Sequence, residues 1–154
     1  MNVLSLFDGL SCGNIALERA GIKVDNYFAS EIDQYAIKIA NKNYPIFQMG
    51  DVKDLTQGML PKIDLLIGGS PCQDLSFAGK GKGLEGDRSS LFYQYFRLLK
   101  ECKPKYFLLE NVKMKKEYQD VISNLLGVQP IKINSSLVSA QNRVRLYWTN
   151  IPGI

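Results

Sequence analysis

The sequence predicts an α/β protein built on a doubly wound, mostly parallel sheet. Apolar runs at 2–7, 27–30, 63–67 and 105–109 each end at a glycine or an acid. Continuous apolar runs closed in this way are typical of buried parallel strands. Helical patterns follow these runs, and the order strand, turn, helix recurs along the chain without internal repeats or a linker. We therefore expect a single Rossmann-like domain over residues 1–154.

The last part of the chain predicts a different pairing. The runs 131–134 and 143–148 are joined by the turn-like segment 139–142, which indicates two antiparallel strands. Period-2 alternation places Arg143, Arg145 and Tyr147 on one face of the second strand, opposite its apolar side chains. We expect this hairpin to add one antiparallel strand to the sheet.

Composition narrows the class of protein. The 154 residues suffice for one domain with a substantial core, and no apolar run approaches the roughly 18 residues that span a membrane. Met1 leads directly into the first apolar run, without the basic region or cleavage site of a signal peptide. We expect a soluble, cytoplasmic protein with no membrane partner.

Residue types also limit the chemistry. Three cysteines lack metal-ligand spacing and the chain has no His, so we expect no metal site. Acid–base work then falls to Asp, Glu, Lys, Tyr or Cys. The net charge of +4 is compatible with a nucleic-acid partner without requiring one.

Turns and acids at the ends of the first three strands suggest a nucleoside pocket. The turn 8–13 contains Gly9 and Gly13, a spacing that differs from the dinucleotide pattern G-x-G-x-x-G. Glu31 follows the second strand roughly 20 residues later, where a carboxylate can accept both ribose hydroxyls; a solvated acid is the alternative. Asp51, after the short strand 46–49, suits an adenine amino group or, equally, the cap of a turn. With no pyrophosphate cradle evident, the pattern favours an adenosine compound other than NAD.

A cysteine and a glutamate mark the ends of two later strands. Cys72 lies in the segment Gly-Gly-Ser-Pro-Cys-Gln that follows the run 63–67, and Glu110 follows the run 105–109. Ligands of open α/β sheets bind at the carboxyl ends of strands, so a thiol there is suited to chemistry, although a small buried Cys is the alternative. If the two strands are neighbours, Cys72 and Glu110 form a thiol–carboxyl pair.

Helix boundaries can be placed from capping signals. Asp33 is suited to cap a helix over 35–40, and Ser89 or Ser90 to cap one through Leu99. We expect Cys102 just past that helix, as a structural thiol. A later helix, 118–126, is expected to stop at Gly127.

The loop 74–88, which has four glycines between Gly79 and Gly86, is expected to form a mobile lid. Basic residues lie in this loop and after the later strands. Such charges usually lie on a solvent-exposed face, but here they converge on one rim of the sheet, which suggests contacts to nucleic-acid phosphates. They are Lys80, Lys82, Arg88, Lys113, Lys115, Lys116, Arg143 and Arg145.

Taken together, these segments resemble the DNA (cytosine-5) methyltransferase family over nearly the whole chain. The motifs occur in the family's order: Phe7 to Gly13, Glu31, Gly50-Asp51-Val52, Gly68 to Gln73, Glu110-Asn111-Val112, and Gln141 to Arg145. Segments 3–9 and 147–153 are similar to the animal de novo branch and also to phage and bacterial members.

The resemblance implies S-adenosyl-L-methionine as cofactor, in a class I methyltransferase fold. Phe7 and Gly9 to Gly13 would surround its methionine and sulfonium end, Glu31 would hold the ribose, and Asp51 would accept from the adenine amino group. The full set of cofactor residues implied is Phe7, Asp8, Gly9, Leu10, Ser11, Gly13, Glu31, Ile32, Asp51, Val52, Pro71 and Leu91, of which Ile32, Val52 and Leu91 would flank the adenine.

The resemblance also implies the reaction. Cys72 as thiolate would attack C6 of a flipped-out cytosine in double-stranded DNA, Glu110 would hydrogen-bond N3, Arg145 would bind O2, and Arg143 would order the site. DNA contacts would come from Gln73, Ser76, Lys80, Lys82, Arg88 and Lys113.

One departure from the family is expected to matter. Family members continue into a target-recognition region and a final segment that covers the cofactor, and the sequence ends shortly after Asn150. The readings are the catalytic half of a split enzyme, a truncated product, or a minimal enzyme that dimerises, so that a second polypeptide or a second copy completes the fold. The rival is a truncated or split non-catalytic module that binds DNA or a partner subunit. A generic nucleotide binder would require the Pro71-Cys72 and Glu110-Asn111-Val112 matches to be accidental.

Overall fold

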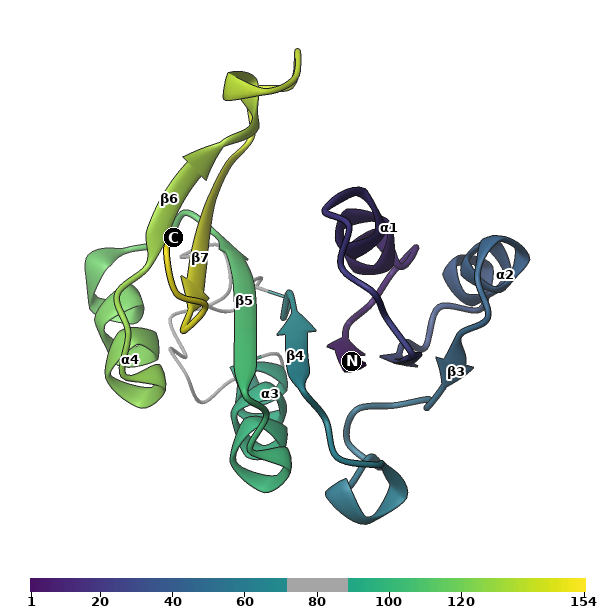
Figure 1. Cartoon of the computed structure of the whole chain (residues 1–154). Helices are drawn as coiled ribbons and strands as arrows, with labels where there is room; N and C mark the ends of the chain where they lie inside the picture. Colours follow the sequence, from purple (N-terminus) through teal and green to yellow (C-terminus); the bar gives the residue numbers. More distant parts are fainter. Residues whose placement is uncertain (72–88) are drawn as a thin grey trace.

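A seven-stranded mixed sheet organises the computed structural model, which describes residues 1–71 and 89–154 (Figure 1). Its strands, in the spatial order β3-β2-β1-β4-β5-β7-β6, are β1 (Asn2–Leu6), β2 (Asn26–Ser30), β3 (Phe47–Gln48), β4 (Leu65–Gly68), β5 (Tyr106–Val112), β6 (Ile131–Asn134) and β7 (Val144–Thr149).

The strand pairing confirms the predicted fold class. β1 pairs in parallel with both β2 and β4, and β4 pairs in parallel with β5. β7 runs antiparallel to β5 and to β6, as the hairpin prediction requires. The strand order reverses direction between β1 and β4, which is the point where open α/β sheets bind ligands.

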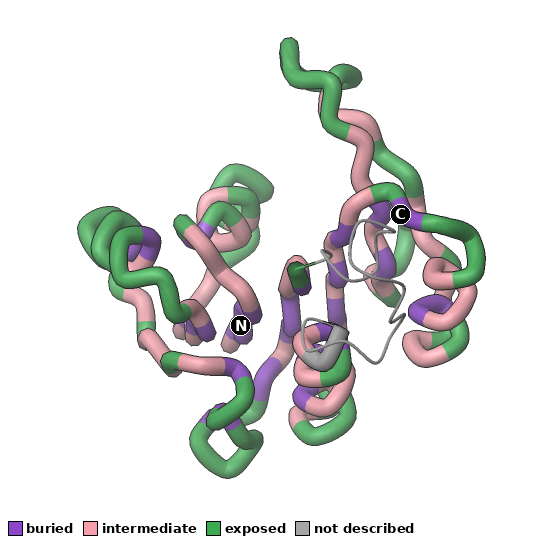
Figure 2. The backbone as a smooth tube through the Cα atoms, turned by 180° about the vertical axis from the view of Figure 1, so that it is seen from behind, coloured by how far each residue is buried: buried purple, intermediate pink, exposed green. Residues whose placement is uncertain are grey.

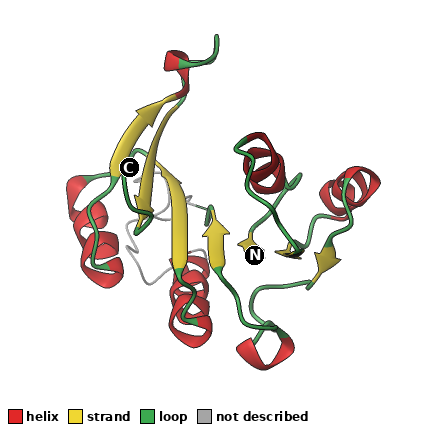
Figure 3. Cartoon of the chain, in the orientation of Figure 1, coloured by secondary structure: helices red, strands yellow, loops and turns green. Residues whose placement is uncertain are grey.

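Helices cover both faces of this sheet (Figures 1 and 3). They are α1 (Cys12–Arg19), α2 (Gln34–Asn43), α3 (Ser89–Cys102) and α4 (Lys116–Leu126), with short 3-10 turns at Gln57–Met59 and Ser135–Leu137. The Asp33 side chain accepts from the amide of Tyr35 at 2.8 Å and so caps α2, and Gly127, with a φ of 73°, ends α4. Both boundaries confirm the sequence predictions.

Two apolar clusters fill the spaces between sheet and helices. The larger joins Leu4, Leu66 and Leu109 of the sheet to side chains of α3 and α4, and includes the fully buried Trp148. The indole N–H of Trp148 donates to Ser123 Oγ at 3.0 Å, so this bulky side chain is buried without an unpaired donor. On the opposite face a smaller cluster around Val3, Leu65 and Ile67 packs against α1 through Leu17. Figure 2 shows the buried residues concentrated along the central strands.

Two local predictions were wrong. β3 comprises only Phe47–Gln48 where the pattern predicted 46–49, because this edge strand pairs on one side alone and leaves Phe47 53% exposed. Cys102 is the last residue of α3 and does not lie beyond it. Burial raises the pKa of the Cys102 thiol, in agreement with a structural role.

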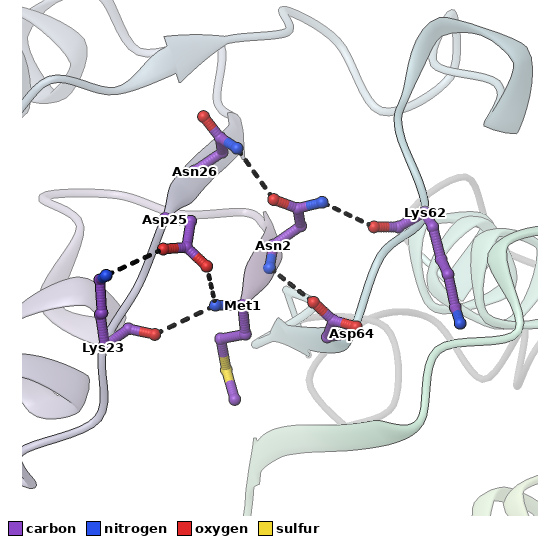
Figure 4. A network of polar contacts seen from close by, with 7 residues as sticks. All are labelled: Met1, Asn2, Lys23, Asp25, Asn26, Lys62 and Asp64. Carbon is purple, nitrogen blue, oxygen red and sulfur yellow. Dashed lines mark hydrogen bonds and ion pairs between the residues drawn. The ribbon is translucent and has the colours of Figure 1, made fainter.

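A polar network joins the strand starts at the amino end of the sheet (Figure 4). Asn2 donates from its side chain to the Lys62 carbonyl and accepts from Asn26, each at 2.9 Å, and its amide donates to Asp64. The amino group of Met1 lies 2.6 Å from Asp25 and lowers the pKa of that carboxyl. These contacts join the starts of β1, β2 and β4.

Among the described helices, none combines the length and the apolar character needed to cross a membrane. The described residues also contain no group of three or more His, Cys, Asp or Glu arranged to hold a metal ion.

Candidate active site

Two adjoining cavities lie at the carboxyl edge of the central strands. The first, of about 450 Å³, is lined by residues that follow β1, β2, β3 and β4. The second, of about 530 Å³, lies between the ends of β1, β4, β5 and β7. Phe7 and Gly69 line both, so a molecule in one cavity would lie beside a molecule in the other.

The turn after β1 separates the cavities and is held in an uncommon backbone conformation. Phe7 and Ser11 have positive φ values of 57° and 59°, which side chains with a Cβ rarely adopt. Asp8 stabilises the turn by accepting from the Ser11 hydroxyl and, at 2.7 Å, from the Tyr27 hydroxyl. Burial and the neighbouring Asp8 carboxylate raise the pKa of Tyr27, so this donor keeps its proton. Strain compensated in this way is typical of functional turns.

Glu31 fixes the position of this turn relative to β2. One carboxylate oxygen accepts from the amide of Gly9 at 2.7 Å, and the other accepts from the amides of Ile32 and Asp33 at 2.8 and 2.9 Å. A carboxylate has about four acceptor positions, so three protein contacts leave about one for a ligand. Glu31 is thus both a structural clamp and a candidate ligand contact.

Asp51 and Val52 complete the far wall of the first cavity. Asp51 accepts from the amide of Lys53 at 2.9 Å, which shows that it does cap a turn while still facing the cavity. Val52 is 3% exposed. Arg97 of α3 holds this segment by donating to the carbonyls of Val52 and Leu55 at 3.1 and 2.9 Å.

Gly69, just after β4, lies directly against the Glu110 side chain near the end of β5. A Cβ placed on Gly69 would lie 2.9 Å from a carboxylate oxygen of Glu110. Asn111, which is buried, lies within 3.3 Å of Ser70 Oγ and 3.4 Å of its carbonyl, and therefore ties the segment leading to Cys72 onto β5. The neighbouring β4 and β5 confirm the strand adjacency on which the Cys72–Glu110 prediction depends.

Charged and phenolic groups gather at the second cavity. Arg145 of β7 lies behind Glu110, with its Nε 2.8 Å from a Glu110 oxygen. Tyr147 faces Glu110 across the β5–β7 pair and lines the cavity together with Arg143. Partial burial and then the Glu110 carboxylate raise the pKa of Tyr147, against the effect of the two arginines.

The structure brings most of the sequence-predicted residues together. Those lining the first cavity are Phe7, Glu31, Ile32, Asp51, Val52, Pro71 and Leu91. Those lining the second are Phe7, Asp8, Gly9, Leu10, Gly13, Glu110 and Arg143.

Other predicted residues lie elsewhere. Ser11 is fully buried beneath the turn, Arg145 contacts the site through Glu110, and Lys113 is exposed beyond β5. Cys72, Gln73, Ser76, Lys80, Lys82 and Arg88, and with them the expected lid, lie outside the described residues.

Sequence reasoning assigned no individual role to several residues that shape the site. Gly69, Tyr27, Asn111 and Tyr147 contact or line the cavities, and Arg97 positions one wall from a distance. Tyr147 shares a strand face with Arg143 and Arg145, a signal that could have identified it. The contact between Arg97 and the Val52 segment spans 45 residues and has no local signal.

Comparison with known proteins gives a consistent picture. A family profile described as C-5 cytosine-specific DNA methylase matches residues 1–126. The chain is 38% identical over 166 residues to the orphan methyltransferase M.SPRI of Bacillus phage SPR, covering 98% of this chain and 38% of the phage protein. It is 35% identical to the type II methyltransferase M1.ScrFI of Lactococcus lactis subsp. cremoris, covering 94% and 40% respectively.

Solved structures share the fold. The S. pombe Dnmt2 methyltransferase superposes with a TM-score of 0.79 at 24% identity, over 100% of this chain and 52% of the other. A prophage-encoded E. coli protein described as a DNA modification methyltransferase gives a TM-score of 0.79 at 30% identity, over 97% and 46%.

The chain spans about two fifths of the length of these sequence relatives, so it corresponds to one part of them. Within that part the match is extensive, because the family profile covers all five parallel strands, β1 to β5, whose ends contribute to the two cavities. By its sequence, and in agreement with its fold, the chain belongs to the C-5 cytosine-specific DNA methylase family.

Proposed function

We propose that residues 1–154 form the catalytic core of an enzyme that transfers a methyl group from S-adenosylmethionine to C5 of cytosine in double-stranded DNA. The observation that carries the proposal is the pair of adjoining cavities at the sheet's switch point. One is suited to an adenosine compound, and the other is lined by Arg143 and by Glu110, which is paired with Arg145. A cofactor and a base held in these cavities would meet at Phe7 and Gly69.

The first cavity has the apolar surface and the hydrogen-bond acceptors that the adenosine part of S-adenosylmethionine requires. Ile32, Val52 and Leu91 provide apolar surface for an adenine ring, and Asp51 provides an acceptor for its amino group. Glu31 has about one acceptor position left for a ribose hydroxyl. The methionine and sulfonium end would extend past Phe7 and Pro71 into the second cavity, against the turn that contains Asp8, Gly9, Leu10 and Gly13. Ser11 would support this turn from beneath through its hydrogen bond to Asp8. Bound there, the cofactor supplies a methyl group on positively charged sulfur.

The second cavity would hold the flipped-out cytosine. Cys72, as the thiolate, would form a bond to C6, while protonated Glu110 would donate to N3 and neutralise the ring charge that develops. Arg145 would contact O2 and Arg143 would order the site. C5 would then become an enamine carbon that takes the methyl group, and the sulfonium would leave as the neutral thioether S-adenosylhomocysteine. Loss of the C5 proton to solvent, return of the N3 proton to Glu110 and expulsion of the Cys72 thiolate would restore the aromatic ring and the free enzyme.

Binding partners follow from this reaction. Gln73, Ser76, Lys80, Lys82, Arg88 and Lys113 would contact the DNA, and the reaction would take place inside the cell that contains it. A second polypeptide or a second copy of the chain is the further partner that the proposal includes.

The test is transfer of labelled methyl from S-adenosylmethionine to cytosine-containing duplex DNA. Wild-type chain is compared with Cys72→Ser and with the matched variant Cys102→Ser, whose thiol lies half-buried at the end of α3 away from both cavities. We expect incorporation with wild type and Cys102→Ser, and none with Cys72→Ser. A folded chain that binds the cofactor but gives no incorporation, alone or with a partner, would support the non-catalytic module.

A further inference from the structure

The hairpin formed by β6 and β7 reaches beyond the carboxyl edge of the other strands. Figure 1 shows it extending past the ends of β4 and β5, with the connecting segment standing clear of the helices. We call residues 135–142 the hairpin tip. Ser135 is half-buried, and the rest of the tip, residues 136–142, is exposed (Figure 2). It therefore lies on the side of the molecule where the two cavities open.

Two apolar side chains stand at the apex of this tip. Leu137 is 79% exposed and Val138 is 88% exposed, the latter being the most exposed large apolar residue of the described chain. Adjacent apolar residues this exposed on an ordered structure suggest a binding contact, because leaving them in water is unfavourable.

The tip is ordered by its own hydrogen bonds. The Ser135 hydroxyl donates to the carbonyl of Gln141 at 2.8 Å, and the Ser139 amide and hydroxyl both donate to the Ser135 carbonyl, at 2.9 and 3.0 Å. Asn134 accepts from the amides of Ser136 and Arg143 at 3.2 and 3.0 Å. Leu137 and Val138 thus lie on a turn whose conformation is held by hydrogen bonds.

The same hydrogen bonds connect the tip to the second cavity. Arg143, which lines that cavity, accepts at its carbonyl from the Ser135 amide at 3.1 Å and donates from its amide to Asn134. A ligand that occupies the second cavity and extends past Arg143 would therefore contact the hairpin tip.

Charge favours nucleic acid as that molecule. Residues 127–154 contain Lys132, Arg143 and Arg145 and no Asp or Glu, and the tip itself adds hydroxyl and amide groups. A stable protein interface buries about 800 Å² on each partner, which a narrow turn with two apolar side chains does not supply. A groove of duplex DNA accepts such a turn, with apolar side chains against base edges and polar groups at the phosphates.

We propose that the hairpin tip contacts duplex DNA beside the target cytosine, with Leu137 and Val138 inside a groove. This inference rests on the proposed function and names a DNA contact outside the residues assigned to it above.

The test compares the DNA affinity of three chains by fluorescence anisotropy with a short labelled cytosine-containing duplex. They are wild type, the double variant Leu137→Ser with Val138→Ser, and the control Ile39→Ser with Met59→Ser, which removes two exposed apolar side chains remote from the hairpin. We expect the tip variant to bind about tenfold more weakly and the control to match wild type. The dependence of log Kd on log salt should be unchanged in the tip variant, because apolar contacts release no counterions.

Further readouts separate this inference from the proposed function. Wild type that binds neither S-adenosylmethionine nor DNA would overturn both. Wild type that binds DNA no better than the tip variant, or a tip variant whose only change is a lower tendency to dimerise, would overturn the DNA contact alone. A photoreactive residue at position 138 should cross-link to the duplex on irradiation, whereas the same residue at position 59 should not.

Discussion

At the scale of single residues, the site depends on how little space separates β4 from β5. Gly69 has no side chain, and this absence lets the Glu110 carboxylate lie where it can pair with Arg145 and face the second cavity. Any larger residue would have to displace a charged group that is itself held by a second charge. Gly69 therefore determines the position of the Glu110 carboxylate by leaving space for it, and not by a hydrogen bond to it.

Gly69→Ala should separate activity from stability. The new methyl group would displace Glu110, so we expect methyl transfer to fall by at least about a hundredfold while the melting temperature changes little, because the carboxylate can move toward the cavity. Gly58→Ala is the matched control, since its Cβ would meet no atom closer than 4.0 Å. Equal activity in the two variants would show that Glu110 does not need this position.

Two buried tyrosines should respond in opposite ways to loss of their hydroxyls. Tyr27 donates to Asp8, whereas the Tyr95 hydroxyl is buried without a hydrogen-bond partner among the described residues. Tyr95→Phe should therefore raise the free energy of unfolding by about 1 kcal/mol, and Tyr27→Phe should lower it by about 1–3 kcal/mol. Urea denaturation of both variants at pH 7 measures the two changes; destabilisation by Tyr95→Phe would reveal a partner for its hydroxyl.

The same tyrosine predicts an alkaline pH dependence. Burial raises the pKa of Tyr95, so its contribution to stability is complete below the unfolded value of about 10 and is lost as pH rises above it. Above pH 10 the Tyr95 phenol ionises in the unfolded protein, whereas it stays neutral in the folded protein. Wild type should therefore lose about 1.4 kcal/mol per pH unit more than Tyr95→Phe above pH 10. Parallel curves for the two proteins between pH 9 and 11 would contradict this origin of the alkaline sensitivity.

At the scale of elements, one helix holds the wall of a cavity formed by another segment. Arg97 of α3 donates to two carbonyls of the segment 52–55, to Glu101 at 2.8 Å and to Gln94. A guanidinium can make these contacts together because its donors form a rigid fork. The position of Val52 beside the first cavity thus depends on α3.

Arg97→Lys should weaken this connection, because one ammonium group cannot reach both carbonyls and Glu101. We expect the free energy of unfolding to fall by about 2 kcal/mol and S-adenosylmethionine to bind several-fold more weakly. Arg19→Lys, at an exposed position in the last turn of α1, is the control for the change of residue type. Calorimetric titration with the cofactor and urea denaturation give the two readouts; unchanged cofactor affinity in a destabilised variant would show that Val52 is held by other contacts.

The elements themselves could be predicted from local signals, and their mutual contacts could not. Apolar runs closed by glycine or acid located β1, β2, β4 and β5, and a capping residue located the start of α2, because each signal lies within a few residues. The Glu110–Arg145 pair and the hold of Arg97 on Val52 depend on strand register and helix position. For the same reason the exposure of Val138 could not be foreseen from an apolar residue in a turn.

At the scale of the whole molecule, the candidate binding cavities and the polar network that joins the strand starts lie at opposite edges of the sheet. Both cavities and the hairpin tip lie at the carboxyl edge, whereas the network around Asn2 joins the amino ends of β1, β2 and β4. A parallel sheet produces this separation, because all its central strands begin at one edge and end at the other.

Asn2→Ala tests whether the two edges are energetically independent. The substitution removes the side-chain contacts to Lys62 and Asn26 but keeps the backbone contact to Asp64, so we expect the free energy of unfolding to fall by about 1–2 kcal/mol. Affinities for S-adenosylmethionine and duplex DNA should stay at wild-type values below the melting transition, because the lost contacts lie at the opposite edge of the sheet from both cavities. Gly69→Ala should show the reverse pattern, with function lost and stability kept. A fall in ligand affinity in Asn2→Ala that matches its loss of stability would instead mean that the strand ends move together, and that the cavities are stabilised by the whole sheet.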